Sequence, residues 1–232
     1  MKTIIFDFDG TLTKKDQNIW KMIWEDLGYS VDKNSLYSKL YVDCIINKTI
    51  TRQQWFDLTV EAFKKKNLTF KNFYNICNKI ELINGITKTL LALKKKNYNL
   101  IIVSGCIDYA IKFILGPHLE FFDAIITNKI EFDSKGNLVN IYPSNCDYEG
   151  KAKFINSYAN YNKTNIKDIL FVGNSDNDEF VYQTGCKTLC INPTKMANSK
   201  NLNVWHKTIE NVNNLTQILP VIDEIFSETE IK

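Results

Sequence analysis

The sequence has few of the residues and patterns that mark secreted, zinc-binding or membrane proteins. Its 232 residues include only two histidines, and its six cysteines show no paired spacing, which argues against a zinc site and a disulfide framework. The first apolar run is too short for a signal peptide before it reaches Asp7, and no stretch approaches the roughly 20 apolar residues of a membrane span. We therefore expect a cytoplasmic protein with reduced thiols and no membrane partner.

Positive and negative charges are also nearly balanced. The net charge is only +3, and the lysine runs at 64–66 and 94–96 fall at the ends of predicted helices, where they complement the helix dipole and face solvent. Such a balance gives no reason to expect a nucleic acid as partner, and it predicts no particular oligomeric state. With 44% hydrophobic residues, the chain is long enough for one large core, or for a core and a small second domain.

Short apolar runs that alternate with helical patterns fill most of the chain. We predict strands at 3–8, 99–104, 122–127, 168–173 and 187–191. We predict helices capped by Asn84 and at 106–115, 150–158 and 215–226. This alternation predicts an α/β fold, with a Rossmann-like, open, mainly parallel sheet and helices on both faces.

Two segments break the alternation. Residues 129–142 alternate apolar and polar side chains around a Ser-Lys-Gly-Asn turn, which predicts a β-hairpin. Residues 15–81 contain no proline and no convincing strand, but they carry tryptophan, leucine and phenylalanine at helical spacing. We therefore predict an all-α cap subdomain at 15–81, inserted into a core made of residues 1–14 and 82–232.

Polar clusters follow several of the predicted strands. Asp7 and Asp9 follow the first strand, Ser104 and Gly105 follow the second, and a Gly-Asn-Ser-Asp-Asn-Asp run at 173–178 follows a later one. In open α/β sheets, ligands bind beside the carboxyl ends of the strands. Two carboxylates at one strand end are costly unless a cation, a proton or hydrogen bonds compensate them. The sequence therefore predicts a charged site at this edge of the sheet.

These clusters resemble the motifs of a known family. The segments DFDGTLT at 7–13, IIVSG at 101–105, Lys151 and FVGNSDND at 171–178 are similar to the four motifs of the haloacid dehalogenase superfamily. Within it, the chain most resembles the phosphoserine-phosphatase-like branch, which has a small helical cap. The resemblance implies a Mg²⁺-dependent phosphomonoester hydrolase that acts on a small phosphorylated metabolite through an aspartyl-phosphate.

The proposed catalytic residues suit that chemistry. Asp7 is a carboxylate that can attack phosphorus without first losing a proton. Asp9, two residues further along a strand, points to the same side, and the resemblance assigns it the role of general acid and base. Lys151 offsets the negative charge of Asp7 and of the phosphate, and we prefer it to Lys153 because it directly follows Gly150 at a helix start.

The remaining site residues are predicted to hold the phosphate, the substrate and the metal. We expect Thr11, Ser104, Gly105 and Asn177 to bind phosphate oxygens. By resemblance, Asp16 binds the amine of the substrate. The single arginine, Arg52, lies about four residues before the position at which the family's cap arginine binds a substrate carboxylate. Phosphoserine is therefore one candidate, and an amine-bearing ester such as phosphoethanolamine or phosphocholine is another.

The magnesium ligands are predicted to be Asp7, through its side chain, and Asp9, through its backbone carbonyl, both by resemblance. The fourth motif departs from the family because Asn174 stands where an aspartate ligand is usual. Asn174 can bind a metal through its amide oxygen, and either Asp178 or Asp176 can supply the missing charge.

Two other functions fit the same motifs. A phosphotransferase or mutase of this superfamily passes the phosphoryl group to another alcohol rather than to water. A non-catalytic protein that binds phosphate esters is the other alternative, and the neutral Asn174 motivates it.

Overall fold

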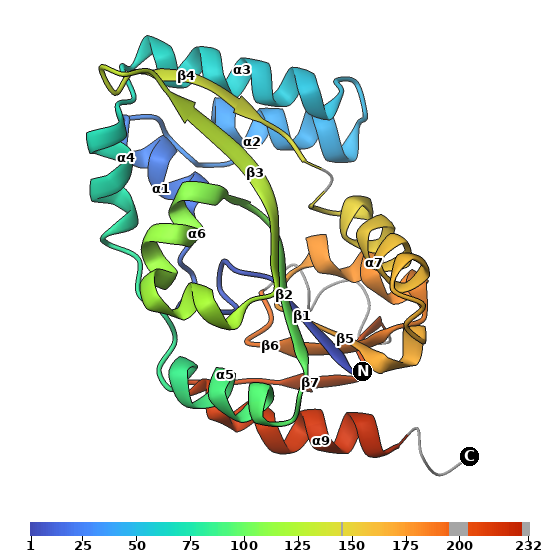
Figure 1. Ribbon diagram of the computed structural model, residues 1–232. Coiled ribbons are helices and arrows are strands. Elements are labelled where there is room, and N and C mark those ends of the chain that lie inside the picture. The colour runs from blue at the N-terminus through green and yellow to red at the C-terminus, as the bar shows by residue number, and fades with distance from the viewer. Residues whose placement is uncertain (145, 195–203, 229–232) are drawn as a thin grey trace.

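The computed structural model describes residues 1–144, 146–194 and 204–228. Within them the strands form a seven-stranded sheet of order β4-β3-β2-β1-β5-β6-β7, with β1 in the middle (Figure 1). The strands are β1 (Thr3–Phe6), β2 (Asn99–Ile107), β3 (Ala124–Phe132), β4 (Leu138–Tyr142), β5 (Ile169–Gly173), β6 (Lys187–Ile191) and β7 (Lys207–Ile209). All pairings are parallel except that of β3 with β4, which confirms the predicted fold class.

The register of the central strands aligns their carboxyl ends. Phe6 of β1 pairs with Ile102 of β2 on one side and with Val172 of β5 on the other. All four residues of β1 are buried, because a central parallel strand is covered on both faces. The residues that follow these three strands therefore meet at one edge of the sheet.

Successive residues of the central strands belong to two different cores. Ile4 and Phe6 pack with apolar residues of α5 (Ile86–Lys95), α6 (Asp108–Leu115) and α9 (Leu219–Ser227). Ile5 packs on the opposite face, with residues of α7 (Glu149–Tyr161) and of the 3₁₀ helix η4 (Asp176–Thr184). Helices thus cover both faces, as the period-two alternation of a strand requires.

Some predicted boundaries were wrong. The helix expected from Asn84 has Gly85 as its N-cap, in the left-handed conformation. The second strand does not end at Ser104 but continues to Ile107, with an irregular register after Val103. The remaining short helices are η2 (Gly116–Phe121), η3 (Ile166–Asp168) and η6 (Leu215–Ile218), and η6 forms the first turns of the predicted last helix. The sequence pattern also missed β7, which is only three residues long.

The hairpin prediction is confirmed, but its first strand is also part of the main sheet. The first half of β3 pairs with β2, and its second half, from Lys129 to Phe132, pairs with β4. The hairpin is therefore an extension of the sheet that reaches toward the inserted helices.

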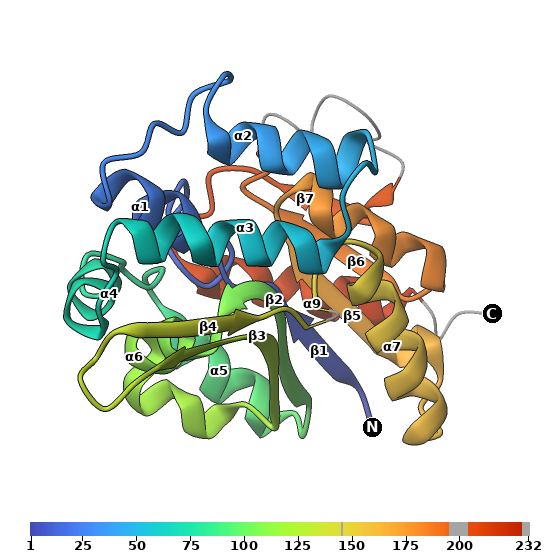
Figure 2. The same ribbon diagram turned by 90° about the horizontal axis from the view of Figure 1, so that it is seen from above.

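Every regular element of the segment between β1 and α5 is a helix. It contains α1 (Ile19–Asp26), α2 (Leu36–Tyr41), the π-helix η1 (Val42–Ile46), α3 (Arg52–Lys65) and α4 (Phe70–Cys77). Thr13 and Leu82, where this segment leaves and rejoins the core, form an isolated bridge. Both views show α3 lying along β4, so the hairpin supports the cap (Figures 1 and 2). We call these helices the cap; the exact division into domains stays a prediction.

None of the helices in the described part of the chain has the length and apolarity needed to cross a bilayer.

Candidate active site

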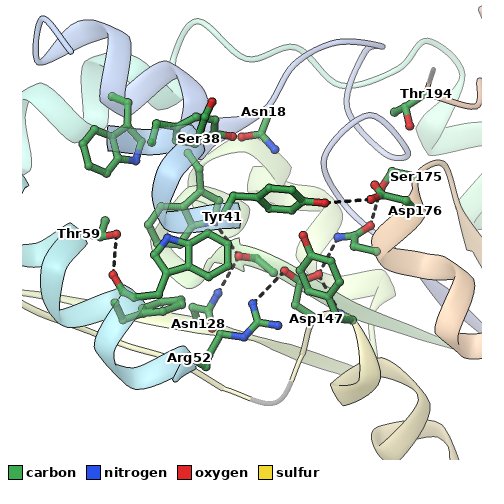
Figure 3. Close-up of a pocket in the computed structure, with 18 residues that line it drawn as sticks. Asn18, Ser38, Tyr41, Arg52, Thr59, Asn128, Asp147, Ser175, Asp176 and Thr194 are labelled. Carbon is green, nitrogen blue, oxygen red and sulfur yellow. Dashed lines mark hydrogen bonds and ion pairs between the residues drawn. The ribbon is translucent and has the colours of Figure 1, made fainter. Parts of the chain in front are cut away.

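The candidate site lies where β1, β2 and β5 end, beneath the cap. A cavity of about 500 Å³ opens there, and both cap and core residues line it. Gly105 and Asn177 are among the lining residues, and so is Arg52, which Figure 3 shows beside Asp147. The site is therefore enclosed by two parts of the chain that are far apart in sequence.

A buried charge cluster lies at the carboxyl ends of the central strands, behind the residues that line the cavity. Lys151, at the start of α7, is fully buried, and its Nζ lies 2.9 Å from Asp7 Oδ1 and 2.5 Å from Asp178 Oδ1. Asp7 directly follows β1, and its backbone N–H donates to the carbonyl of Val172 in β5. The lysine thus bridges the end of β1 and the start of η4, as a counter-ion for two carboxylates.

The protonation of this cluster follows from its neighbours. Burial alone would lower the pKa of Lys151, but the charges of Asp178 and Asp7 raise it well above its ordinary value. Burial raises the pKa of Asp178 to about 7, against the opposing charge of Lys151. Lys153, the alternative considered above, is exposed on α7. The geometry therefore favours Lys151 as the cationic partner of Asp7.

Asp9 is a half-buried acid two residues after Asp7. Burial, followed by the negative charge of Asp7, raises the pKa of Asp9 to about 8. Its Oδ1 is buried and has no hydrogen-bond partner among the described residues, and the same holds for Thr11 Oγ1. Asp9 therefore holds a proton at neutral pH, which is the form that a general acid needs.

The oxygen donors at this edge fit a hard divalent cation. The Asn174 side chain, which follows β5, lies directly against the Cα of Gly10, so Gly10 leaves no room for a Cβ there. This contact places an amide group beside the Asp7–Asp9 turn, and the orphaned oxygens of Asp9 and Thr11 lie on that same turn. Carboxylate, amide and hydroxyl oxygens suit Mg²⁺. No three His, Cys, Asp or Glu side chains of the described ranges form a metal cluster by themselves, so this set depends on neutral oxygens.

Asp178 is already engaged by the protein. Besides its ion pair with Lys151, its Oδ2 accepts hydrogen bonds from the backbone N–H groups of Asn174 (3.0 Å) and Ser175 (3.2 Å). The carboxylate therefore positions the lysine and the loop after β5. Its assignment as a metal ligand stays a prediction. Asp176, the other candidate for the missing charge, lines the cavity and accepts a 3.4 Å hydrogen bond from the Tyr41 hydroxyl of the cap.

The second motif lies within the irregular end of β2. Ser104 is buried, and its Oγ accepts a hydrogen bond from the N–H of Cys106. The carbonyl of Gly105 accepts from Trp20 Nε1 (2.8 Å) and from Asn128 Nδ2 (2.7 Å). A Cβ on Gly105 would lie 2.5 Å from Asp147 Oδ2, so a larger residue here would displace the Asp147 side chain.

Asp147 is a site residue that the sequence reasoning missed. Its Oδ1 accepts a 2.6 Å hydrogen bond from Asn177 Nδ2, and its Oδ2 lies 3.6 Å from Nη1 of Arg52. Burial raises its pKa, although Lys151 and Arg52 act in the opposite direction. Its position four residues before Lys151 was the available signal, but a lone aspartate in a polar loop does not stand out.

Asp16 does not join the other predicted residues. It lies in an exposed turn with a positive φ of 65° and is not among the residues that line the cavity. Arg52, in contrast, begins α3 and lines the cavity beside Asp147 (Figure 3). The structure thus brings Asp7, Lys151, Asp178 and Asn174 together in one buried cluster. It places Gly105 and Asn177 in the cavity lining, whereas Asp16 joins neither group.

The fold is shared with solved phosphatases. A phosphoserine phosphatase trapped as a phospho-aspartyl intermediate analogue matches with a TM-score of 0.70 and 20% identity over 95% of this chain and 98% of the other. A substrate-bound phosphoserine phosphatase matches with a TM-score of 0.67 and 19% identity over 95% and 97%. A haloacid dehalogenase family hydrolase from Salmonella enterica serovar Typhi matches with a TM-score of 0.70 and 16% identity over 96% and 71%.

At the level of sequence, a search of curated proteins found no match. The model of the haloacid dehalogenase-like hydrolases, however, matches residues 4–178. That range contains every predicted site residue, from Asp7 to Asp178. The chain therefore belongs to the haloacid dehalogenase-like hydrolase family.

Proposed function

We propose that this protein is a Mg²⁺-dependent phosphatase that hydrolyses a small phosphomonoester through an aspartyl-phosphate on Asp7. The observation that carries the proposal is the buried pairing of Asp7 with Lys151 at 2.9 Å, beside an acid that keeps its proton at neutral pH. Family membership supports the reaction class, and the second aspartate favours phosphoryl transfer over halide displacement.

The first step is the attack of an Asp7 oxygen on phosphorus. A bond forms between that oxygen and phosphorus while the bond to the ester oxygen breaks, and Asp9 gives its proton to the leaving alcohol. Lys151 compensates the charge of the Asp7 carboxylate and of the phosphoryl oxygens. Mg²⁺, held by Asp7, Asn174 and the backbone carbonyl of Asp9, would supply further positive charge to the same oxygens.

The second step returns the enzyme to its first state. Asp9, now a carboxylate, takes a proton from a water molecule, and the resulting oxygen attacks the phosphorus of the aspartyl-phosphate. The bond between Asp7 and phosphorus breaks, and inorganic phosphate leaves. The cap limits the access of other water to the cavity, which protects the intermediate until this step.

Several groups are available to hold the phosphoryl oxygens. We assign this role to Thr11, Ser104, the N–H of Gly105 and Asn177. Thr11 and Ser104 are buried just after β1 and within β2, and Gly105 and Asn177 line the cavity. Phosphoserine stays one candidate substrate, supported by the fold. The exposed position of Asp16 removes the basis for an amine reader at that residue.

The test is a panel of phosphorylated metabolites, with release of inorganic phosphate measured with and without Mg²⁺. Release that depends on Mg²⁺ supports the proposal, and release at no Mg²⁺ concentration favours the non-catalytic binder. Product analysis with an added acceptor alcohol separates hydrolysis from phosphotransfer, because a transferase would convert the acceptor into a new phosphoester.

A further inference from the structure

The cavity has two chemically different sides. Six aromatic side chains of the cap line one side, and we call them the aromatic wall: Trp20, Trp24, Tyr37, Tyr41, Trp55 and Phe56. They come from α1, α2 and α3, which lie together over the end of the sheet (Figure 2). The core lines the other side with Gly105, with one aromatic residue, Tyr148, and otherwise with polar residues: Asn128, Asp147, Ser175, Asp176, Asn177 and Thr194.

The polar groups that accompany the aromatic wall are already bound within the cap. The Asn18 side chain accepts from the N–H of Lys21 as the N-cap of α1. The Ser38 hydroxyl donates to the carbonyl of Asp32, and the Thr59 hydroxyl donates to the carbonyl of Trp55 (Figure 3). What this side mainly presents to a ligand is therefore ring surface, chiefly that of Trp20, Tyr37, Tyr41 and Trp55, because Trp24 and Phe56 are buried within the cap.

The charges beside the wall favour an uncharged ring over a cation. Arg52 is the one cation among the described lining residues, and its guanidinium lies over the rings of Trp55 (5.5 Å) and Tyr148 (4.9 Å). A second positive group on the same rings would meet this charge at close range. The two nearest carboxylates are also engaged, Asp147 by Asn177 and Arg52 and Asp176 by Tyr41.

The volume is consistent with a substrate that has a sizeable organic part. About 500 Å³ lies within the range of roughly 300–1,000 Å³ that is usual for small-molecule sites. The lining residues Ser175, Asp176 and Asn177 directly precede Asp178, the carboxylate that shares Lys151 with Asp7. The phosphoryl group therefore belongs at this core end, and the organic part of the substrate extends toward the aromatic wall. Flat rings gain most from such a surface, through burial and edge-to-face contacts.

We infer that the preferred substrates are phosphomonoesters whose alcohol carries an aromatic ring, which the aromatic wall binds. This inference rests on the proposed phosphatase function. It differs from phosphoserine and from the amine-bearing esters considered above, because its specificity comes from ring contacts rather than from paired charges.

The test compares benzyl phosphate with ethyl phosphate, whose alcohols are both poor leaving groups of similar acidity. We expect kcat/KM to be roughly ten- to a hundredfold higher for benzyl phosphate. Trp55→Ala should reduce this ratio about tenfold or more, because it should lower kcat/KM for benzyl phosphate much more than for ethyl phosphate. Leu58→Ala is the matched control, because Leu58 lies on the same helix but is 42% exposed and does not line the cavity.

A second measurement separates this inference from the phosphatase proposal. Calorimetry on the intact protein should show that benzylphosphonate, which cannot be hydrolysed, binds at least about tenfold more tightly than ethylphosphonate, and that Tyr41→Ala or Trp55→Ala narrows the difference. Circular dichroism verifies that each variant is folded.

Equal kcat/KM values for the two esters, or equal affinities for the two phosphonates, would overturn the inference while leaving the phosphatase proposal intact. Failure of the phosphatase proposal would give a different result. Absence of turnover for both esters, with the phosphonate preference retained, would reject the phosphatase function but support the ring-binding wall.

Discussion

The core side and the cap side of the cavity are stabilised by different interactions. The core behind the cavity holds the fully buried Lys151 between Asp7 and Asp178, an arrangement that is stable only when every charge has its partner. The cap side holds rings whose contacts are individually weak and tolerant of change. Because of this difference, we expect substitutions on the core side to affect the reaction itself and substitutions on the cap side to affect substrate preference.

The largest expected effect is that of Asp7→Asn. An amide is a poor nucleophile, so kcat should fall by about 10⁴-fold or more, while the protein remains folded because the amide keeps the size of the side chain. Phosphate release from the best substrate of the panel, together with a thermal melt, measures both. Substantial residual turnover would contradict the assignment of the nucleophile.

Removal of the shared cation should affect stability as well as activity. Lys151→Met leaves Asp7 and Asp178 buried without their partner, and we expect a loss of about 3–5 kcal/mol in the free energy of unfolding, along with loss of turnover. Chemical denaturation measures the loss. Lys153→Met on the same helix is the control, because its exposed side chain should change stability by less than about 0.5 kcal/mol. Equal effects of the two substitutions would refute the buried cluster.

The proton of Asp9 predicts a pH dependence. Because the raised pKa of Asp9, about 8, keeps the acid protonated below that pH and ionised above it, kcat/KM for an alkyl ester should decline as pH rises past about 8. A nitrophenyl ester needs no proton on its leaving group and should decline less. Asp9→Asn should lower the alkyl rate by about 10²-fold or more. Parallel pH profiles for the two esters would argue against Asp9 as the acid.

A smaller effect is expected at Asn174, the position at which the chain departs from the family motif. Asn174→Asp restores a negative ligand of the same size beside Gly10, so the Mg²⁺ concentration for half-maximal activity should fall by roughly fivefold to twentyfold. Titration of activity with Mg²⁺ measures the change. Asn165→Asp, at the N-cap of η3 and outside the cavity lining, serves as the control for adding one charge.

The smallest effect is expected for Asp16→Asn. Its side chain is exposed and does not line the cavity, so kcat/KM should change by less than about twofold. A large rise in KM for an amine-bearing ester would restore the role that the sequence suggested for this residue.

The fold was predictable because its signals are local. The buried run of β1, the alternation of 129–142 and the helical spacing in 15–81 each reflect the periodicity of one element. The errors occurred where a local pattern is incomplete, as at the three-residue β7, or where long-range pairing prevails, as in β2, which continues past Ser104 because its end pairs with β3.

The sequence by itself determined the candidate reacting groups. Asp7 and Asp9 follow a predicted strand and Lys151 stands at a predicted helix start, and the resemblance of these motifs to the haloacid dehalogenase superfamily suggested their roles before their positions were known. Only the tertiary structure decided which other residues join them. Asp147 is brought to Arg52, which stands more than ninety residues earlier, and Asp16 is left in solvent, because both positions depend on how the cap packs on the core rather than on any local pattern.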